Sequence, residues 1–296
     1  MGDGRVLFKL GVIADAQYGD KDTKGHRDYR GSLAKLEQAT AAIGRVEGIC
    51  GVLHLGDLIE GHGSGERAQT REQQHAASAH DLQQIMAVLH AQPAAGPRPV
   101  WNVVGNHDHS LPRSELHAAF DPDRRSNPVH PAALYYDCEL AEGWRLVVLD
   151  TTAVSTANGF RWPPAGPTGA ELLEAADRYL AVHEGEDNAV DWNGGVGAAQ
   201  LAWLAGVLAR CAAAGERAVV CGHAPLLPEA SDAWHVAWDW EEVVAVLDAQ
   251  SGVVALYLSG HDHRGGYARS AAGVPHVTVA GMVEAPSGSN AYAVRE

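Results

Sequence analysis

Cysteine is scarce in this chain: its 296 residues include only Cys50, Cys138, Cys211 and Cys221. None of them stands in the Cys-x-x-Cys spacing of many zinc sites and redox motifs, and the first three lie in or beside apolar stretches. We therefore expect buried, reduced thiols, as in cytosolic proteins. A structural zinc site or a disulfide is the alternative interpretation.

Positive charge is also in short supply, with 22 Lys and Arg against 37 Asp and Glu and a net charge of −15. Such a chain would be repelled by nucleic acids and anionic membranes, so non-specific binding to either is not expected. A small anionic substrate stays open, because bound metal cations invert the local field.

Long apolar runs are missing as well: none approaches the roughly 18 residues of a membrane-spanning helix. The first residues lead directly into an apolar strand, without the charged start and apolar core of a secretory leader. We therefore expect a soluble protein of the cytoplasm.

Short apolar runs alternate with stretches of helical spacing, which predicts an α/β fold. Helices are expected from an N-cap at Ser32 through Ile43, over Glu66–His90, after Gly197 and over Trp240–Gln250. The runs that we interpret as buried strands are Leu10–Ile13, Val52–Leu55, Val100–Val104, Ala218–Val220 and Val253–Leu258.

Near the carboxyl end, polar and apolar residues alternate over Tyr257–Ala268, His276–Val279 and Ala291–Val294. These closing strands predict a second, partly antiparallel sheet packed on the first, in a two-sheet sandwich flanked by helices. No internal boundary or repeat is evident, so residues 1–296 are expected to form a single domain. The long Pro- and Gly-rich stretch 151–197 is expected to be a functional insertion that caps the site.

Potential metal ligands follow each of the five buried strands, where the ligand-binding loops of an α/β sheet converge. A single Gly-Asp or Gly-His pair would be an ordinary turn, but five in this order predict one dinuclear metal site. The clusters are Asp15-Ala16-Gln17, Gly56-Asp57, Gly105-Asn106-His107-Asp108, Gly222-His223 and Gly260-His261-Asp262-His263.

The clusters offer carboxylates, amides and imidazoles, which suit hard divalent cations. Seven side chains suffice for two cations with Asp57 between them, and two such ions clamp a phosphoryl group during in-line displacement. They are Asp15, Gln17, Asp57, Asn106, His223, His261 and His263. His107 would donate a hydrogen bond to a phosphoryl oxygen or protonate the leaving oxygen, with Asp108 holding its imidazole. No role is assigned to His54, His90 or His276.

The ordered motifs Asp-x-Gln, Gly-Asp-x-x-Glu, Gly-Asn-His-Asp, Gly-His and Gly-His-x-His resemble the calcineurin-like metallophosphoesterase superfamily over essentially the whole chain. Two positions depart from the usual pattern: Gln17 stands where the superfamily has His, and Glu60 where it has Asp. We expect Glu60 to lie behind the ligands. The Gln is shared by a narrower branch, the manganese-dependent ADP-ribose/CDP-alcohol diphosphatases. Further stretches similar to that branch are Gly11–Tyr18, Tyr29-Arg30, Trp192–Gly195, Leu227–Asp232, Gly260–Tyr267 and Val283–Pro286.

The resemblance implies a four-layer αββα fold and a centre of two divalent ions, Mn²⁺ with iron or zinc as alternatives. It implies hydrolysis of the pyrophosphate bond of nucleoside-diphosphate conjugates such as ADP-ribose, CDP-choline or CDP-glycerol. One metal would be held by Asp15, Gln17, Asp57 and His263, and the other by Asp57, Asn106, His223 and His261.

Substrate contacts are expected from Asn193, Gly194 and Gly195, whose backbone amides could face a ligand. A tight turn is the equal alternative for this loop. Arg30 and Arg264 are candidates to neutralise the second phosphate, although surface arginines are usually only solvated.

Two other functions are consistent with the same residues. A phosphodiesterase acting on cyclic nucleotides or other diesters would use the same metals, and a non-catalytic scaffold would keep only the fold. The second is disfavoured because all seven ligands and His107 are present. The partner is expected to be a small nucleotide conjugate, and the sequence leaves the oligomeric state open.

Overall fold

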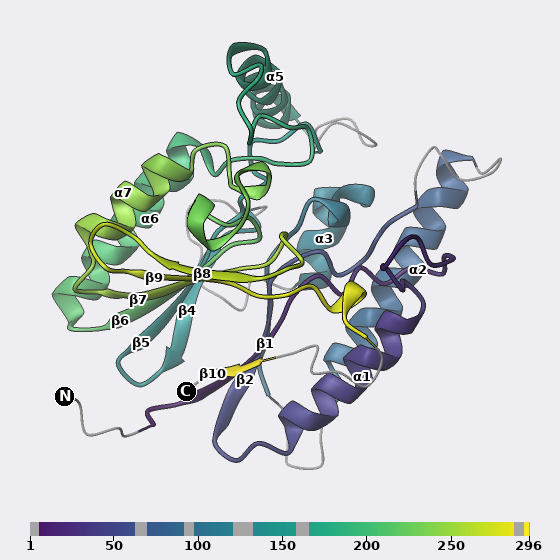
Figure 1. Cartoon of the computed structure of the whole chain (residues 1–296), viewed down its shortest axis with the longest axis horizontal. Helices are drawn as coiled ribbons and strands as arrows, with labels where there is room; N and C mark the ends of the chain where they lie inside the picture. Colours follow the sequence, from purple (N-terminus) through teal and green to yellow (C-terminus); the bar gives the residue numbers. More distant parts are fainter. Residues whose placement is uncertain are drawn as a thin grey trace.

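In the computed structural model, two β-sheets pack face to face and helices cover the outer face of each (Figure 1). The structure describes residues 6–62, 70–91, 98–120, 133–157, 166–286 and 293–295. The two-sheet αββα sandwich expected from the sequence is therefore confirmed.

The first sheet has the strand order β10-β1-β2-β3. Its strands β1, β2 and β3 run parallel, and β10 pairs antiparallel with β1. The expected closing strand near Val294 thus lies in the first sheet, whereas we had placed it in the second; Ala291 and Tyr292 are outside the described residues. The strands are β1 Lys9–Ile13, β2 Ile49–His54, β3 Val100–Asn102 and β10 Ala293–Arg295.

The second sheet has the order β4-β5-β6-β7-β9-β8, with β5, β6, β7 and β9 parallel and an antiparallel strand at each edge. The hairpin of β4 and β5 was missed from the sequence, because charged residues such as Asp137 and Arg145 interrupt its apolar pattern. The strand expected over Tyr257–Ala268 is two strands, β7 and β8. The bounds are β4 Tyr136–Ala141, β5 Trp144–Val148, β6 Arg217–Cys221, β7 Val254–Ser259, β8 Gly266–Arg269 and β9 Pro275–Thr278.

Alternation along the strands divides the core into three layers. In β1, Leu10 and Val12 point into the layer between the sheets, whereas Ile13 points outward to the helices. Helices α1 and α2 cover the first sheet, and α6 and α7 cover the second (Figure 1). Their bounds are α1 Gly31–Gly44, α2 Arg71–Leu89, α6 Gly197–Ala214 and α7 Trp240–Ala249.

Two predicted helix starts need correction. Ser32 is not the N-cap of α1, because it lies inside the first turn and donates its hydroxyl to the carbonyl of Asp28. The Asp28 carboxylate instead accepts from the backbone N–H of Gly31. Helix α2 begins later than Glu66, which is outside the described residues: Thr70 caps it in a reciprocal capping box with Gln73.

Among the described helices, α6 alone is long and apolar enough to cross a membrane by length and composition, with a mean hydropathy of 1.3. Its apolar side packs in the core through Trp203, Leu204 and Val207, so the same composition serves a core helix here. The expectation from apolar runs missed it because Gln200 and Arg210 interrupt the stretch.

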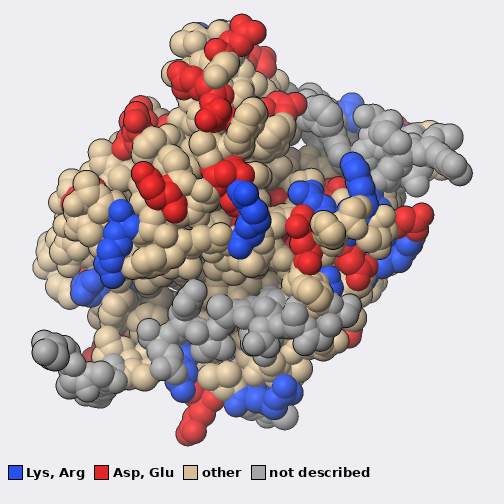
Figure 2. Space-filling model, viewed as in Figure 1, with Lys and Arg blue, Asp and Glu red and all other residues tan. Residues whose placement is uncertain are grey.

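The insertion 151–197 contains a helix, α5 (Gly166–Val182), which projects beyond the two sheets in Figure 1. Acidic side chains gather at this top end of the face shown in Figure 2, and Glu171, Glu174 and Asp177 are exposed on α5. Tyr179 anchors the helix, because its ring stacks on Trp238 and its hydroxyl donates to the carbonyl of Trp238. Of the expected cap, the segment Trp162–Pro164 lies outside the described residues.

The four cysteines are free thiols, as expected. Cys211 and Cys221 are buried in the core, whereas Cys50 and Cys138 are half-buried.

Candidate metal centre

The five predicted clusters lie at the carboxyl ends of parallel strands, and the fold brings them to one edge between the two sheets. Asp15 follows β1, Asp57 follows β2, and Asn106 lies in the loop after β3. His223 and His261 follow β6 and β7 from the second sheet. The centre is therefore assembled from both sheets.

Backbone strain is concentrated at this edge. Four non-glycine residues of the described chain have a positive φ: Asp15 (50°), Gln17 (40°), Asp57 (53°) and His261 (68°). All four belong to the predicted ligand set. Side chains rarely adopt this conformation without a compensating gain, and such strain is typical of functional sites.

Gln17 and Asp57 contact each other at the strand ends of the first sheet, and both, like Asp15, are fully buried. The Gln17 side-chain nitrogen donates to the Asp57 carboxylate at 3.1 Å, and Asp15 accepts the backbone N–H of His261 at 3.1 Å. The Gln17 Oε1 atom is buried and has no hydrogen-bond partner. A buried oxygen without a donor fits a metal ligand, since a cation would satisfy it.

Each of the three histidines has one ring nitrogen fixed by an acceptor outside the ligand set. His223 Nδ1 donates to the carbonyl of Leu55 at 2.9 Å, and His263 Nδ1 donates to Glu284 at 2.9 Å. His261 Nε2 contacts Asn193 Oδ1 at 2.8 Å. Such contacts orient metal-binding imidazoles and leave the other nitrogen free to bind.

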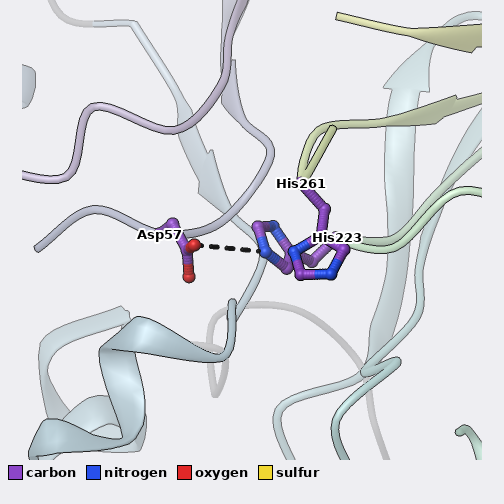
Figure 3. Close-up of side chains that lie close together, drawn as sticks. All are labelled: Asp57, His223 and His261. Carbon is purple, nitrogen blue, oxygen red and sulfur yellow. Dashed lines mark ion pairs between the residues drawn. The ribbon is translucent and has the colours of Figure 1, made fainter. Parts of the chain in front are cut away.

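The second ring nitrogens of His223 and His263 lie close to the oxygens of other predicted ligands. His223 Nε2 lies 3.1 Å from Asn106 Oδ1 and 3.4 Å from the Asp57 carboxylate, and Figure 3 shows both His223 and His261 close to Asp57. His263 Nε2 lies 3.6 Å from the Asp15 carboxylate. Nitrogen and oxygen lone pairs that lie this close together are stabilised by a proton or a cation between them. Because they converge at two places, around Asp57 and around Asp15, the residues fit two divalent ions.

Two glycines leave the space that this packing requires. A Cβ on Gly56, which has φ of 96°, would lie 2.6 Å from the His223 ring. A Cβ on Gly105 would lie 2.1 Å from the Asp57 carboxylate. The Gly before Asp57 and the Gly before Asn106 are therefore steric requirements of the site.

The charges of the pocket stabilise one another. Burial by itself would raise the pKa of Asp57, but the neighbouring His223 and His107 hold it well below its ordinary value. Burial lowers the pKa of His223, and Asp57 more than reverses this and raises it to about 9. The pKa of His261 falls well below its ordinary value, through burial and the charge of His223. The Asp57 carboxylate is thus ionised, as cation binding requires.

His107 lies beside the ligands, and Glu60 orients it. Its backbone N–H donates to Asp57 at 2.9 Å, and its Nδ1 lies 3.0 Å from the Glu60 carboxylate. Burial lowers the pKa of His107, but Asp57 and Glu60 outweigh it and raise the pKa to about 9. The Nε2 atom of a protonated ring can donate to a substrate oxygen.

The predicted role of Asp108 as the residue that holds His107 is wrong. Its carboxylate instead accepts the backbone N–H groups of Asp57, Leu58 and Gly105, at 3.1, 2.9 and 2.9 Å. Burial raises the pKa of Asp108 to about 7. Asp108 therefore shapes the loop after β2, and the residue behind His107 is Glu60.

The loop Asn193-Gly194-Gly195 lies at the site but in another role than expected. The backbone N–H of Asn193 donates to Val190 and that of Gly195 to Val154, so neither amide faces a ligand. The side-chain nitrogen of Asn193 donates to two carbonyls, which leaves its oxygen to accept from His261. Asn193 therefore positions a predicted metal ligand, and a substrate contact through the backbone N–H of Gly194 stays a prediction.

The two arginines expected to neutralise the second phosphate are engaged elsewhere on the surface. Arg30 contacts the exposed carboxylates of Asp20 and Asp22, each at 2.6 Å. Arg264 bridges Asp232 and Asp262. Neither arginine contacts the predicted ligands in the described part of the chain.

The principal residue missed as a site residue is Glu284, which holds His263 from the short helix η5 (Met282–Glu284). Its only signal was the similarity of Val283–Pro286 to the diphosphatase branch. The alternation of strands could not reveal it, because Glu284 lies 21 residues beyond His263 in the chain.

Two divalent ions held by carboxylate, amide and imidazole groups between two parallel-stranded sheets define a dinuclear metal-dependent hydrolase. The sequence comparisons place the chain within this class: a family model described as calcineurin-like phosphoesterase matches residues 8–265. The chain belongs to that family.

Relatives match nearly the whole chain. A protein of Danio rerio called manganese-dependent ADP-ribose/CDP-alcohol diphosphatase is 31% identical over 308 residues, which cover 97% of this chain and 91% of the relative. The Arabidopsis thaliana protein of the same name is 29% identical over 305 residues, covering 97% and 89%. The crystal structure of a dimetal phosphatase from Danio rerio is similar with a TM-score of 0.80 and 28% identity, covering 97% and 92%.

Proposed function

We propose that this enzyme is a manganese-dependent hydrolase of the pyrophosphate bond in nucleoside-diphosphate conjugates, such as ADP-ribose and CDP-alcohols, and releases two monophosphates. The observation that carries the proposal is similarity over 97% of the chain to diphosphatases of that name. Gln17 supports it, because its unpartnered buried oxygen stands where the wider superfamily has a histidine.

The predicted ligands divide into two groups around Asp57. Asp15, Gln17 and His263 would hold one ion on its β1 side, and Asn106, His223 and His261 would hold the other. When bound, the two ions supply charge neutralisation for the phosphoryl group and a water of lowered pKa.

The chain itself contributes hydrogen bonding and proton transfer. His107, with Nδ1 held by Glu60, presents Nε2 to a phosphoryl oxygen or to the leaving oxygen. Cleavage of the pyrophosphate bond releases one half of the substrate as a monophosphate. A proton delivered to the oxygen of this leaving group lowers the barrier to its departure. Asn193 fixes the ring orientation of His261, and buried Asp108 fixes the loop that carries Asp57.

The test is release of monophosphates by the Mn²⁺-loaded protein from ADP-ribose, CDP-choline, CDP-glycerol, 2′,3′-cyclic AMP and bis-p-nitrophenyl phosphate. Fast turnover of a diphosphate conjugate, with AMP or CMP as product, is the expected result. Activity confined to the cyclic or diester substrates would replace the proposal with a phosphodiesterase on the same metals.

The matched control is Asp57→Asn, which keeps the size of the central side chain but removes its charge. We expect the variant to lose both activity and bound Mn²⁺. A wild-type protein that binds no Mn²⁺ by elemental analysis after loading would favour the scaffold alternative.

We further propose that the enzyme works in the cytoplasm on small molecules and not on nucleic acids or membranes. Its four free thiols suit a reducing compartment, and its net charge of −15 disfavours polyanionic partners. Detection of the native protein only in a secreted fraction would contradict the location.

A further inference from the structure

The parallel strand β5 also ends in polar residues, which are outside the predicted ligand set. The loop after it, Asp150-Thr151-Thr152, is buried, and it was not predicted as part of the site because the hairpin that leads into it was missed. Helix α6 holds this loop from behind. The backbone N–H of Asp150 donates to the Gln200 side-chain oxygen at 2.8 Å, and the Gln200 side-chain nitrogen donates back to the Asp150 carbonyl at 2.9 Å.

Thr152 contacts the short helix that carries His107, η1 (His107–Ser110). Its hydroxyl and its backbone N–H both donate to Asp150 Oδ1, at 2.8 and 2.9 Å. His109 Nε2 lies 2.8 Å from the same hydroxyl oxygen. A hydroxyl has a single proton, so Thr152 Oγ1 accepts its second hydrogen bond from the N–H of His109. The second sheet thereby holds η1.

Arg113 keeps Asp150 an acceptor. It lies at the start of α3 (Arg113–Phe120), and its guanidinium group contacts the Asp150 carboxylate. Burial by itself would raise the pKa of Asp150, but Arg113 outweighs burial and lowers it. An ionised carboxylate can only accept, which fixes the direction of the hydrogen bonds from His109 through Thr152 to Asp150.

Side chains decide the orientation of η1. It is only four residues long, and a 3₁₀ turn of that length has few internal hydrogen bonds. Asp108 fixes one side of it to the first sheet, through the backbone N–H of Asp57. His109 fixes the other side to the second sheet, through Thr152. Because His107 belongs to the same turn, the direction of its ring depends on both attachments.

Thr151 contacts the loop that carries His223. The backbone N–H of Ala224 donates to Thr151 Oγ1 at 3.0 Å. A Cβ on Gly222 would lie 2.8 Å from Thr151 Cγ2, so the Thr151 methyl group lies directly against this glycine. Thr151 therefore contacts both chain neighbours of His223.

We propose that the loop Asp150-Thr151-Thr152 is a positioning element of the active site, which holds His107 through Thr152 and His223 through Thr151. Both threonines act through other residues, and neither belongs to the predicted ligand set. The ring that faces the substrate and a predicted metal ligand are thus tied to one loop of the second sheet.

The first test is Thr152→Val, which removes the hydroxyl and nearly preserves the size of the buried side chain. We expect kcat at saturating Mn²⁺ to fall by roughly 10–100-fold, because His107 leaves its productive orientation, whereas Mn²⁺ affinity should not change. Thr152→Ser keeps the hydroxyl and should retain most of kcat. Free Mn²⁺ is followed by electron paramagnetic resonance, and kcat is measured with the compound of the test panel that the enzyme hydrolyses fastest.

The second test makes the same change one residue earlier. Thr151→Val removes the acceptor of the Ala224 N–H, so Mn²⁺ affinity should fall by roughly tenfold, as for other groups behind metal ligands. Thr151→Ser should bind Mn²⁺ like the wild type. Thr156→Val is the matched control and should change neither Mn²⁺ affinity nor kcat, because the Thr156 hydroxyl donates to the carbonyl of Asp191, outside this network.

A double-mutant cycle separates positioning of His107 from a general loss of structure. In the His107→Ala background, Thr152→Val should lower kcat no further, because the side chain that it positions is gone. Equal losses of kcat in the two backgrounds would overturn the role of Thr152. His109→Phe keeps a ring and removes the N–H, so it should reproduce the loss and takes the place of Thr152→Val if that variant does not fold.

Unchanged kcat in Thr152→Val and His109→Phe would overturn the proposal, and so would unchanged Mn²⁺ affinity in Thr151→Val. The kcat measurements rest on the proposed function, through the role of His107, whereas Mn²⁺ binding is measured without any substrate. If none of the compounds is hydrolysed, the proposed function fails, and Mn²⁺ binding by the Thr151 variants still decides the positioning role of this loop.

Discussion

At the scale of single residues, the centre combines strained backbone with fixed rings. Asp15, Gln17, Asp57 and His261 have positive φ, and the histidines are oriented by acceptors that are not ligands themselves. Both features cost free energy in the protein without bound metal. They are retained because they hold the acceptors in place before a cation arrives, which reduces the entropy lost on binding.

His107→Ala should lower kcat by roughly 10²–10⁴-fold, the contribution of a positioned proton donor. Mn²⁺ binding should survive, because the contact of residue 107 with Asp57 is made by its backbone N–H and remains in the variant. Steady-state kinetics and Mn²⁺ titration of the same preparation check both statements. An unchanged kcat would remove His107 from the mechanism.

At the scale of elements, five of the parallel strands end in a cluster of ligands, namely β1, β2, β3, β6 and β7, and α1, α2, α6 and α7 pack on the outer faces of the two sheets. Helix α2 packs on the first sheet through Leu82, Ile85 and Leu89, while its capping box at Thr70 lies exposed at the far end. The helix also holds the loop after β2, because Ser78 and Asp81 of α2 hydrogen-bond to His62.

Thr70→Ala should destabilise the protein by about 1 kcal/mol, since it removes the side-chain half of the capping box. Urea unfolding measures this loss, and kcat should not change. Thr40→Ala is the control: Thr40 bonds only to carbonyls of its own helix, and Ala is the better helix former there. Equal losses in the two variants would show that capping is not the cause.

At the scale of the whole molecule, stability is expected to depend on pH through buried, neutral histidines. Burial lowers the pKa of His109 to about 3 and that of His276 to about 4. Both ring nitrogens of His276 are buried without a hydrogen-bond partner. The unfolded chain therefore binds more protons than the folded one below about pH 6.5, and stability is lost as the pH falls through that window.

His276→Leu should reduce this dependence, because leucine cannot be protonated in the unfolded chain. Between pH 6.5 and 5 we expect the wild type to lose about 2 kcal/mol more than the variant. Above pH 7 His276 is neutral in both the folded and the unfolded chain, so the difference in free energy of unfolding between the two proteins should no longer change with pH. Urea unfolding of both proteins at matched Mn²⁺ concentration decides it, and parallel losses would contradict a neutral His276 in the folded state.

Much of the fold was determined by local sequence. The prediction was right for the five buried strands, for the helices after Gly197 and from Trp240, and for the five clusters at the strand ends. Apolar periodicity and the turns that end an element depend on residues that are neighbours in the sequence, so the sequence reveals them. The hairpin of β4 and β5 was missed, since its alternating charges resemble a loop. Helix ends were less certain, as Ser32 shows.

The sequence by itself determined that carboxylate, amide and imidazole groups follow successive strands, and therefore that they meet at one edge. Only the tertiary structure decided what holds each of them. Glu284 behind His263, Asn193 behind His261 and the carbonyl of Leu55 behind His223 come from distant parts of the chain. Hydrogen bonds depend on distance and direction in space, and a backbone carbonyl has no side-chain identity that a sequence could reveal.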